Sequence, residues 1–489
     1  MLVIGHGGTG KSVLIDAITE TFAFHNEEEA LAKCGTSGIS STHVNGSTVH
    51  FWAGLGVHRM KTLNCSKKIQ ARRKQNILGK KCLIIDEMSM LYDTLLTDVA
   101  KVVSYTKKAE NEGNHNLPFA GMHVILFGDF HQFPPVAKSQ SALYSLRQAT
   151  DPDVLQGRLL YKQFKKVYWL RQQIRIKDKI WEDILNRVRV GQCDDTDIKT
   201  IRSLILNNPD CPPTDFSKPP WSDAVLITTR HTVREAWNAA CLSRHCRSTG
   251  NRRYIVPAED FMSQSGSIPS NNVRLRIARL SIKATKNLSD RIEIAVGMKA
   301  MILANISTEG EVANGTRGTI SDIILDPRED FDDIEEDGTI KLRYPPATII
   351  FQPEGSSDIS AAFVDERVSG NMKLGKGQVP ISPCKATFTV IMADGSKVSI
   401  HRRQYAITGG YAFTDFKSQA QTIKTVIVDL RDPPTGKISP FSAYVTLSRS
   451  RGRDTIRLLS DFDEELFKRH PSADLAVEME RLTLLAATL

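Results

Sequence analysis

The 489-residue sequence lacks several features that would assign it to particular classes of protein. It contains no run of 18 apolar residues, so no transmembrane helix is expected. No secretory or transit peptide is recognisable, and no repeat of solenoid length occurs along the chain. Its eight cysteines include no C-x-x-C pair, which argues against a structural zinc site and is typical of a reduced intracellular protein.

Neither the composition nor the charge is extreme. Hydrophobic residues make up 41% and charged residues 24%, as in soluble globular proteins with a large core. The length suggests two to four domains. The net charge of +9 fits a polyanionic partner, but so mild an excess is also common in proteins that have no such partner.

The first motif is a glycine-rich segment between a predicted strand and a predicted helix. Residues 1–5 are an apolar run suited to a buried parallel strand, and residues 13–22 have the apolar spacing of a helix. Between them, residues 5–12 read Gly-His-Gly-Gly-Thr-Gly-Lys-Ser and match the phosphate-binding pattern G-x-x-x-x-G-K-[ST]. The candidate nucleotide-binding residues are Gly5, Gly7, Gly8, Thr9, Gly10, Lys11 and Ser12.

Each residue type in this motif has a physical role. Glycines let backbone N–H groups wrap phosphate oxygens, and the start of the following helix adds positive potential. Lys11 can reach the β- and γ-phosphates of ATP, and the Ser12 hydroxyl can bind Mg²⁺. The sequence therefore predicts an ATP site that uses magnesium.

A second predicted strand ends in two acids. The apolar run 82–85 is followed directly by Asp86 and Glu87. An acid at the carboxyl end of a parallel strand projects into the crevice where ligands bind in open α/β sheets. Asp86 can therefore hold magnesium, while Glu87 can orient and deprotonate the attacking water.

A third predicted strand, residues 124–127, ends at Gly128-Asp129 and leads into an unusual loop. Gln132 in that loop could sense the γ-phosphate or position water. Phe133, followed by two prolines, offers a rigid apolar surface on which a nucleic-acid base could rest.

Together these segments resemble the Pif/RecD-like branch of superfamily-one DNA helicases. Segments similar to further motifs of that branch follow in order at residues 32–40, 46–51, 170–175, 184–191, 411–422 and 444–449. The resemblance spans nearly the whole chain, and its later segments are most similar to forms found in fungal genomes and Helitron-type mobile elements. It implies an ATP-dependent helicase that moves 5′-to-3′ on single-stranded DNA, unwinds forked or duplex DNA, and serves DNA repair, recombination or telomere maintenance.

The resemblance also implies roles for individual residues. Arg175 and Arg449 match the two arginine fingers of the family, which join Glu87 and Gln132 in the expected catalytic set. Residues 411–422 are similar to the motif that couples DNA contact to the nucleotide. The residues expected to contact DNA are Thr36, His50, Phe51, Phe133, Lys417, Ser418 and Gln419.

The implied fold is α/β, with two RecA-like P-loop motor domains and a small SH3-like β-barrel insertion in the second. The expected boundaries are 1–165 for the first motor domain, 166–317 and 405–489 for the second, and 318–404 for the insertion. Short alternating runs around Asp394-Gly395 predict a β-hairpin inside the insertion. The acidic segment 326–337 is expected to be an exposed, mobile loop.

The chain departs from the family pattern in two places. Ala420 stands where the coupling motif usually has glycine, and its methyl group could crowd a tight backbone approach. Only four residues precede Gly5, whereas the family has an adenine-recognising segment there. Either the sequence is truncated at its N-terminus, or base recognition is lost.

Two other functions stay open at this point. One is a P-loop ATPase that does not act on DNA, and the other is a truncated, non-catalytic DNA-binding remnant of a mobile-element helicase. DNA-stimulated ATP hydrolysis would separate them from a helicase. The expected location is intracellular, with the nucleus first and the mitochondrion as the alternative, and no membrane partner is expected. The residues do not indicate an oligomeric state.

Overall fold

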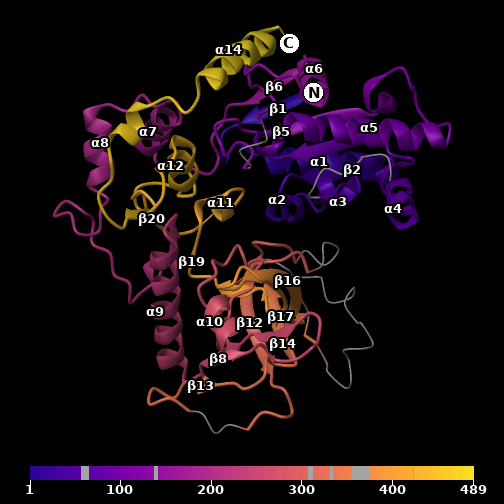
Figure 1. Cartoon of the computed structure of the whole chain (residues 1–489). Helices are drawn as coiled ribbons and strands as arrows, with labels where there is room; N and C mark the ends of the chain where they lie inside the picture. The colour runs from indigo at the N-terminus through magenta and orange to yellow at the C-terminus, as the bar shows by residue number, and fades with distance from the viewer. Residues whose placement is uncertain are drawn as a thin grey trace. The chain divides into compact units, whose positions relative to one another are not determined.

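The computed structural model describes residues 1–56, 65–136, 141–306, 312–330, 334–354, 374–375, 377–421 and 423–488. The chain divides into two compact units (Figure 1). Unit 1 comprises Met1–His231 and Phe413–Leu489, and unit 2 comprises Thr232–Ala412. Each unit is described by itself.

Unit 1 contains a six-stranded parallel sheet with the strand order β3-β2-β4-β5-β1-β6. Its strands are β1 (Leu2–Gly5), β2 (Leu31–Gly35), β3 (Ser47–Thr48), β4 (Cys82–Asp86), β5 (His123–Gly128) and β6 (Val167–Leu170). The helices that follow them are α1 (Lys11–Phe24), α2 (Gly38–His43), α3 (Val49–Trp52), α4 (Lys67–Ile77), α5 (Asp93–Ala109) and α6 (Pro152–Lys162). The inner strands β1 and β4 are buried along their whole length, as expected of apolar runs with both faces covered. Because these strands are parallel, the ends of β1, β4 and β5 lie at one edge of the sheet, which is where a ligand binds in such folds.

A second sheet of unit 1 has the order β19-β7-β20-β21, with β20 parallel to both β7 and β21. Its strands are β7 (Val225–Thr228), β19 (Ala412–Phe413), β20 (Val426–Asp429) and β21 (Ile456–Leu458). The accompanying helices are α7 (Lys179–Val190), α8 (Asp195–Arg202), α11 (Asp415–Ser418), α12 (Pro440–Leu447), α13 (Glu465–Lys468) and α14 (Ala473–Ala487). Strands β7 and β20 are adjacent although about 200 residues separate them, so the chain leaves this sheet to build unit 2 and then returns.

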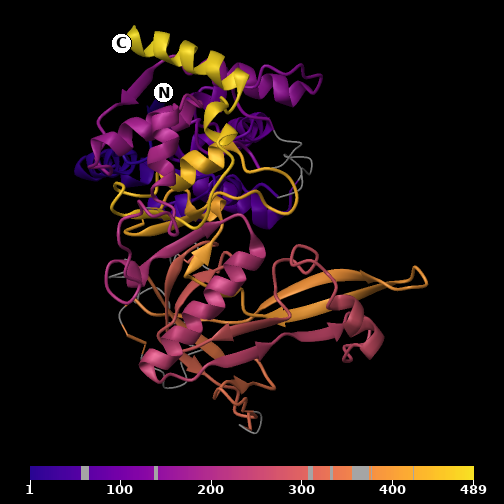
Figure 2. The same ribbon diagram turned by 90° about the vertical axis from the view of Figure 1, so that its left-hand side faces the viewer.

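Unit 2 is rich in antiparallel strands. It contains a five-stranded sheet of order β15-β14-β12-β11-β18 and two three-stranded sheets, β16-β17-β9 and β10-β8-β13. The strands are β8 (Tyr254–Pro257), β9 (Glu259–Met262), β10 (Arg291–Ile294), β11 (Lys299–Ile302), β12 (Arg317–Ile324), β13 (Ile340–Lys341), β14 (Thr348–Pro353), β15 (Val379–Ile381), β16 (Cys384–Ile391), β17 (Lys397–Gln404) and β18 (Ile407–Gly409). The helices α9 (His231–Thr249) and α10 (Asn271–Ile277) accompany them. The long β16–β17 hairpin stands out in Figure 2.

The β-rich part of the chain is larger than the insertion expected at 318–404. Its first strand is β8, whose four residues are too few for an alternating pattern of polar and apolar residues to be recognised in the sequence. The whole of Thr232–Ala412 forms one compact unit. The expected hairpin lies between β16 and β17, and its turn contains Gly395 in a left-handed conformation with φ 80°. The expected acidic loop at 326–337 falls partly outside the described residues, at 331–333.

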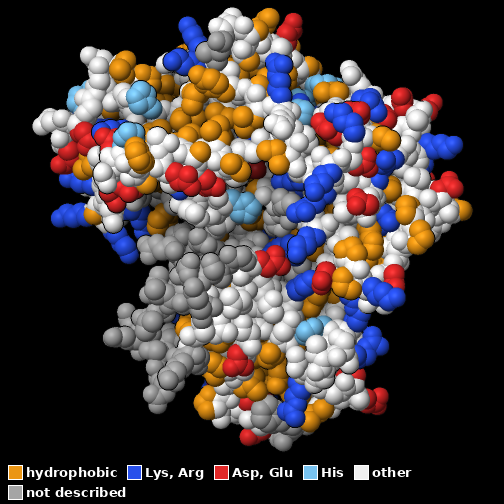
Figure 3. Space-filling model, turned by 180° about the vertical axis from the view of Figure 1, so that it is seen from behind, with side chains coloured by type: hydrophobic (Ala, Val, Ile, Leu, Met, Phe, Trp, Pro, Cys, Tyr) orange, Lys and Arg blue, Asp and Glu red, His pale blue; other side chains and the backbone are white. Residues whose placement is uncertain are grey.

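The surface offers little direct guidance to function. On the face shown in Figure 3, Lys and Arg side chains are interspersed with Asp and Glu. Among the residues that the structure describes, no helix combines the length and apolar character needed to cross a membrane.

Helix α14 completes the core of the first sheet's domain. It lies beside β6 (Figure 1), and Leu475 and Leu482 are fully buried in the same apolar cluster as β1 and β5. Tyr161 of α6 donates its hydroxyl to Glu478 at 2.5 Å, so a polar contact accompanies the apolar one.

We expect Leu482→Ala to lower the free energy of unfolding by about 2–5 kcal/mol, because it leaves a cavity in this cluster. Urea denaturation followed by circular dichroism measures the change. Leu484 on the same helix is 66% exposed, so Leu484→Ala should change stability by no more than about 0.5 kcal/mol. Equal losses in the two variants would contradict the packing of α14.

Candidate functional site

The glycine-rich segment forms the turn between β1 and α1. Gly8 and Gly10 have φ 90° and 89°, in the left-handed region that favours glycine. Lys11 folds back over the turn and donates from Nζ to the carbonyl oxygens of Gly5, at 2.7 Å, and His6, at 3.0 Å. Burial lowers the pKa of Lys11, while the nearby carboxylates oppose that shift. The ammonium group is thus placed inside the loop, where it can exchange carbonyl oxygens for phosphate oxygens.

Close packing also requires glycine in this loop. A Cβ atom on Gly5 would lie 2.3 Å from Thr9 Oγ1, and one on Gly8 would lie 2.4 Å from Arg175 Cβ. At these distances, a residue larger than glycine cannot occupy position 5 or 8 unless neighbouring atoms move. The glycine pattern therefore reflects both backbone conformation and a tight fit against the segment that carries Arg175.

Asp86 and Glu87 lie at the carboxyl end of β4, and both are buried. Asp86 Oδ1 has no hydrogen-bond partner among the described residues. Burial and the neighbouring Glu87 raise the pKa of Asp86, because two adjacent carboxylates in a low-dielectric site disfavour each other's ionisation. An unpaired carboxylate oxygen under this repulsion fits a site that takes a divalent cation.

The two candidate fingers meet at the glycine-rich loop. A Cβ atom on Gly7 would lie 3.3 Å from Arg449 Nη2 and 3.5 Å from Arg175 Nη1, so both guanidinium groups face the same turn. Arg175 Nη1 donates to the Ser448 carbonyl at 3.2 Å. Burial, and after it the adjacent Arg175, lower the pKa of Arg449 to about 9. Such a cluster is suited to an anionic ligand.

These groups line one cavity of about 410 Å³. Its lining comes from the ends of strands of the first sheet and from loops further along the chain, including Gly7, Gly8, Gly10, Lys11, Ser12, Asp86, Glu87, Gln132, Arg175 and Arg449. Gln132 is 2% exposed, and its Oε1 has no partner among the described residues. Sequence reasoning missed five further residues of the lining, namely Val13, His43, Ile174, Lys177 and Arg451.

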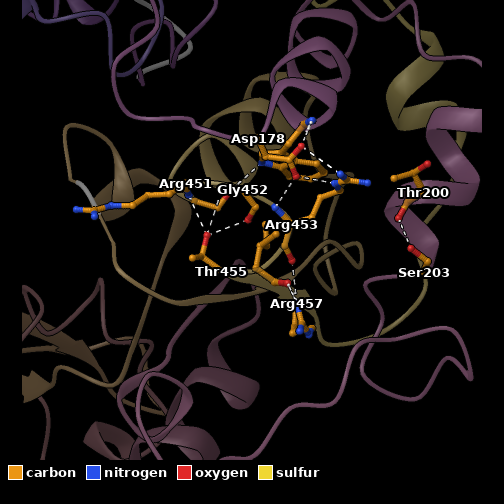
Figure 4. Close-up of polar contacts among 11 residues, drawn as sticks. Asp178, Thr200, Ser203, Arg451, Gly452, Arg453, Thr455 and Arg457 are labelled. Atoms are coloured by element: carbon orange, nitrogen blue, oxygen red, sulfur yellow. Dashed lines mark hydrogen bonds and ion pairs between the residues drawn. The ribbon is translucent and has the colours of Figure 1, made fainter.

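Arg451 belongs to the tight loop that follows α12. Arg451 N and Gly452 N both donate to Thr455 Oγ1, at 3.0 and 3.2 Å. Arg453 turns to Asp178, which accepts from its Nε at 2.6 Å, whereas Arg451 extends away from this ion pair (Figure 4). Its place beside Arg449 in the sequence was a signal that could have identified it, since both belong to the run Ser-Arg-Ser-Arg.

Some residues expected to contact DNA are accessible. Phe51 is 39% exposed, and the Arg72 guanidinium lies over its ring at 4.5 Å from the centroid. Thr36 and Lys417 are half-buried. His50 is also half-buried, with Nε2 at 3.2 Å from the Tyr92 hydroxyl.

Three others turn inward. Ser418 is fully buried and donates to the Asp415 carbonyl at 2.6 Å, and Gln419 is 4% exposed. Phe133 is 3% exposed and is covered by Phe416, with ring centroids 4.0 Å apart. Phe416 is the accessible ring of this pair, with 43% of its side chain exposed, and its position within the coupling motif could have drawn attention to it.

Ala420 has φ 63°, in the left-handed region, and lines the cavity. The usual glycine at this position therefore has a conformational reason, and the methyl group makes this backbone strained.

We expect Ala420→Gly to raise the free energy of unfolding by about 1 kcal/mol, because the strain of a left-handed alanine is removed. Thermal unfolding measures the change. Ala17→Gly is the matched control in the exposed middle of α1, and it should lower stability by about 1 kcal/mol. A loss in both variants would show that Ala420 is not strained.

Comparison with known proteins connects this geometry to a family. Residues 1–199 match the PIF1-like helicase family. The ATP-dependent DNA helicase PIF1 of Emericella nidulans is 24% identical over 492 residues and the helicase RRM3 of Saccharomyces cerevisiae 25% identical over 490, covering 96% and 93% of this chain. The chain spans 59% and 62% of the length of these two curated relatives.

Solved structures show the same fold. The crystal structure of Pif1 helicase from Candida albicans has a TM-score of 0.65 at 19% identity, covering 99% of this chain and 95% of that one. Pif1 from Bacteroides, bound to single-stranded DNA, has a TM-score of 0.61 at 19% identity, with coverage of 98% and 92%. The matched segment, residues 1–199, contains the phosphate loop and both strand-end acids, so this part of the chain is similar to the PIF1-like helicase family, and the likeness to the solved structures shows the same fold over nearly the whole chain.

Proposed function

We propose that this protein is a DNA helicase that hydrolyses ATP with Mg²⁺ and uses the energy to move along single-stranded DNA and separate duplex or forked DNA. The observation that carries this proposal is the single cavity where a phosphate loop, two strand-end acids and two arginines from distant segments converge. The curated relatives are named ATP-dependent DNA helicases, which supports the same activity.

ATP is the substrate, and its phosphates belong in the loop from Gly5 to Ser12. Backbone N–H groups of the loop and Lys11 Nζ would hold the phosphate oxygens. Ser12 and Asp86 would hold Mg²⁺, which supplies charge neutralisation on the phosphate oxygens when bound. The unpaired Oδ1 of Asp86 supports this assignment.

Glu87 is the proposed general base, because it lies next to Asp86 and lines the same cavity. It would orient a water molecule and accept its proton as the water attacks the γ-phosphorus. Gln132 would contact the γ-phosphate, and Arg175 and Arg449 would stabilise the charge that develops on the transferred group. Lys177 and Arg451 add positive charge to the cavity lining.

DNA would be held by both stacking and charge. Phe51 with Arg72 above it, and the exposed face of Phe416, are the aromatic surfaces suited to bases, while Thr36, His50 and Lys417 lie in the segments that resemble backbone contacts. A solved Pif1 from Bacteroides is described as bound to single-stranded DNA, which supports this partner. Movement in the 5′-to-3′ direction, roles in repair, recombination or telomere maintenance, and a nuclear or mitochondrial location follow from the resemblance alone.

The two sheets of unit 1 would be the centres of two RecA-like motor domains. The first would extend past the expected boundary at 165 to include β6, which pairs with β1, and would also include α14, while the second would be built from the remaining segments of unit 1 after 170 and after 412. The five-stranded antiparallel sheet of unit 2 is the proposed SH3-like insertion, since it contains β12, β14 and β15, and the chain enters β19 of the second sheet soon after its last strand, β18.

The first test compares Lys11→Ala with Glu87→Gln. The parent should hydrolyse ATP faster when single-stranded DNA is present, and both variants should lose that hydrolysis. Lys11→Ala removes a phosphate contact, so ATP affinity should fall, whereas Glu87→Gln keeps the shape of the site and should bind ATP as the parent does. Hydrolysis assays and equilibrium binding of a fluorescent ATP analogue give both quantities.

Equal loss of ATP affinity in the two variants would overturn the roles of Lys11 and Glu87. A parent that binds DNA but never hydrolyses ATP would point instead to a non-catalytic DNA-binding protein. A parent whose hydrolysis ignores DNA would point to a P-loop ATPase with another substrate.

The fingers give an independent prediction. Arg175→Ala and Arg449→Ala should each reduce the rate of hydrolysis by about 10³–10⁵ while single-stranded DNA still binds. Arg453→Ala is the matched control, because Arg453 lies in the neighbouring loop but pairs with Asp178. If either finger variant stays within a few-fold of the parent, that arginine is a structural ion-pair partner rather than a finger.

A further inference from the structure

Two residues from the segments expected to contact DNA form hydrogen bonds with Glu87. Thr36 Oγ1 donates to the backbone carbonyl of Glu87 at 3.0 Å. Gln419 Nε2 donates to the carboxylate Oε2 of Glu87 at 2.9 Å. Glu87 itself has φ 55° and ψ 50°, a left-handed conformation that side-chain-bearing residues rarely adopt. The proposed base is therefore held in an unusual conformation by contacts from two different DNA-related segments.

The contact with Gln419 differs from an ordinary structural hydrogen bond. Both side chains are 4% exposed, so water cannot readily replace either partner. Gln419 Oε1 has no hydrogen-bond partner among the described residues, whereas a buried amide that serves only the fold normally pairs both of its ends. The Gln419 side chain is therefore buried with its amide oxygen unpaired, while its amide nitrogen donates to the carboxylate of Glu87.

The same short segment also holds the second finger. Arg449 Nη1 donates to the carbonyl oxygens of Ser418, at 3.4 Å, and Gln421, at 3.1 Å. The side chain of Gln419 therefore faces the base, while the carbonyls on either side of it face Arg449. A displacement of this segment would move the contacts of both catalytic groups together.

The other end of the segment reaches the surface. Phe416 in α11 is 43% exposed and stacks on the buried Phe133, which follows Gln132 in the loop after β5. Lys417 is half-buried, and its carbonyl accepts from Gln421 Nε2 at 2.7 Å. Only two peptide bonds separate the accessible Lys417 from Gln419, so a strand of DNA bound here cannot shift α11 without shifting the donor to Glu87.

We propose that Gln419 is a positioning residue that orients the Glu87 carboxylate for its water, and that this hydrogen bond carries the stimulation of hydrolysis by DNA. This inference rests on the proposed ATPase function of the cavity. Gln419 acts through Glu87 and does not contact DNA itself. One carboxylate oxygen is fixed by the amide, so the rotation that would turn the other oxygen away from the attacking water is restrained.

The test replaces Gln419 with methionine, which has nearly the same length but no donor. In Gln419→Met, kcat at saturating single-stranded DNA should fall about tenfold, the effect of losing one hydrogen bond to a charged group. The ratio of kcat with DNA to kcat without DNA should fall towards one. The KM for ATP and the Kd for single-stranded DNA should stay close to those of the parent, because neither ligand touches this side chain.

A second variant separates positioning from folding. In long single-turnover reactions, adding Gln419→Met to Glu87→Gln should not slow the residual hydrolysis further, since the carboxylate through which Gln419 acts has already been replaced. Gln404→Met is the matched control, because Gln404 is also a fully buried glutamine whose amide donates to a backbone carbonyl, at 3.2 Å, but it belongs to unit 2. It should leave the stimulation ratio at the parental value.

Each contrary result has a definite meaning. If Gln419→Met keeps the parental kcat and stimulation ratio, the proposal is overturned. If it weakens DNA binding while kcat at saturating DNA is unchanged, Gln419 is a direct DNA contact and the proposal is again overturned. If the unaltered protein shows no hydrolysis at all, the proposed function fails first, and the inference that rests on it fails with it.

Discussion

The arrangement of unit 1 depends on one buried carboxylate, Asp129, at the end of β5. It is fully buried, and it accepts from Arg189 Nη2 of α7 at 2.6 Å and from the Tyr444 hydroxyl of α12 at 3.1 Å. Burial alone would raise the pKa of Asp129, but Arg189 and the neighbouring histidine hold it well below its ordinary value. Removing either charge would leave the other buried and unpaired, which is strongly destabilising. This contact therefore fixes the first sheet to helices that belong with the second.

The candidate catalytic groups follow from that connection. Helix α12 leads directly to Ser448 and Arg449, and α7 follows the segment that carries Arg175. Because Asp129 holds both helices against the end of β5, both arginines reach the loop after β1. The proposed site is thus a consequence of how the two sheets of unit 1 are joined, and neither sheet could form it alone.

Strained backbone is concentrated at the same place. Glu87 and Ala420 are both left-handed residues with side chains, and both line the cavity. Such conformations persist only where surrounding contacts determine them, and here those contacts come from Thr36, Gln419 and the segment that holds Arg449. Strained backbone of this kind is typical of functional sites, where surrounding contacts hold side chains in positions that the local sequence does not favour.

The sequence by itself determined the local units of the site. An apolar run, a glycine loop with Lys11 and Ser12, and acids directly after strands are short-range patterns, so their place at the ends of β1 and β4 followed from the residues. Only the tertiary structure decided which side chains face which partners. It buried Phe133 and Ser418, turned Gln419 to Glu87 rather than outward, and joined Asp129 to residues 60 and 315 positions away. It also decided that the β-rich unit begins well before residue 318. These outcomes depend on contacts between segments far apart in the chain, and no local pattern of hydrophobicity or charge contains that information.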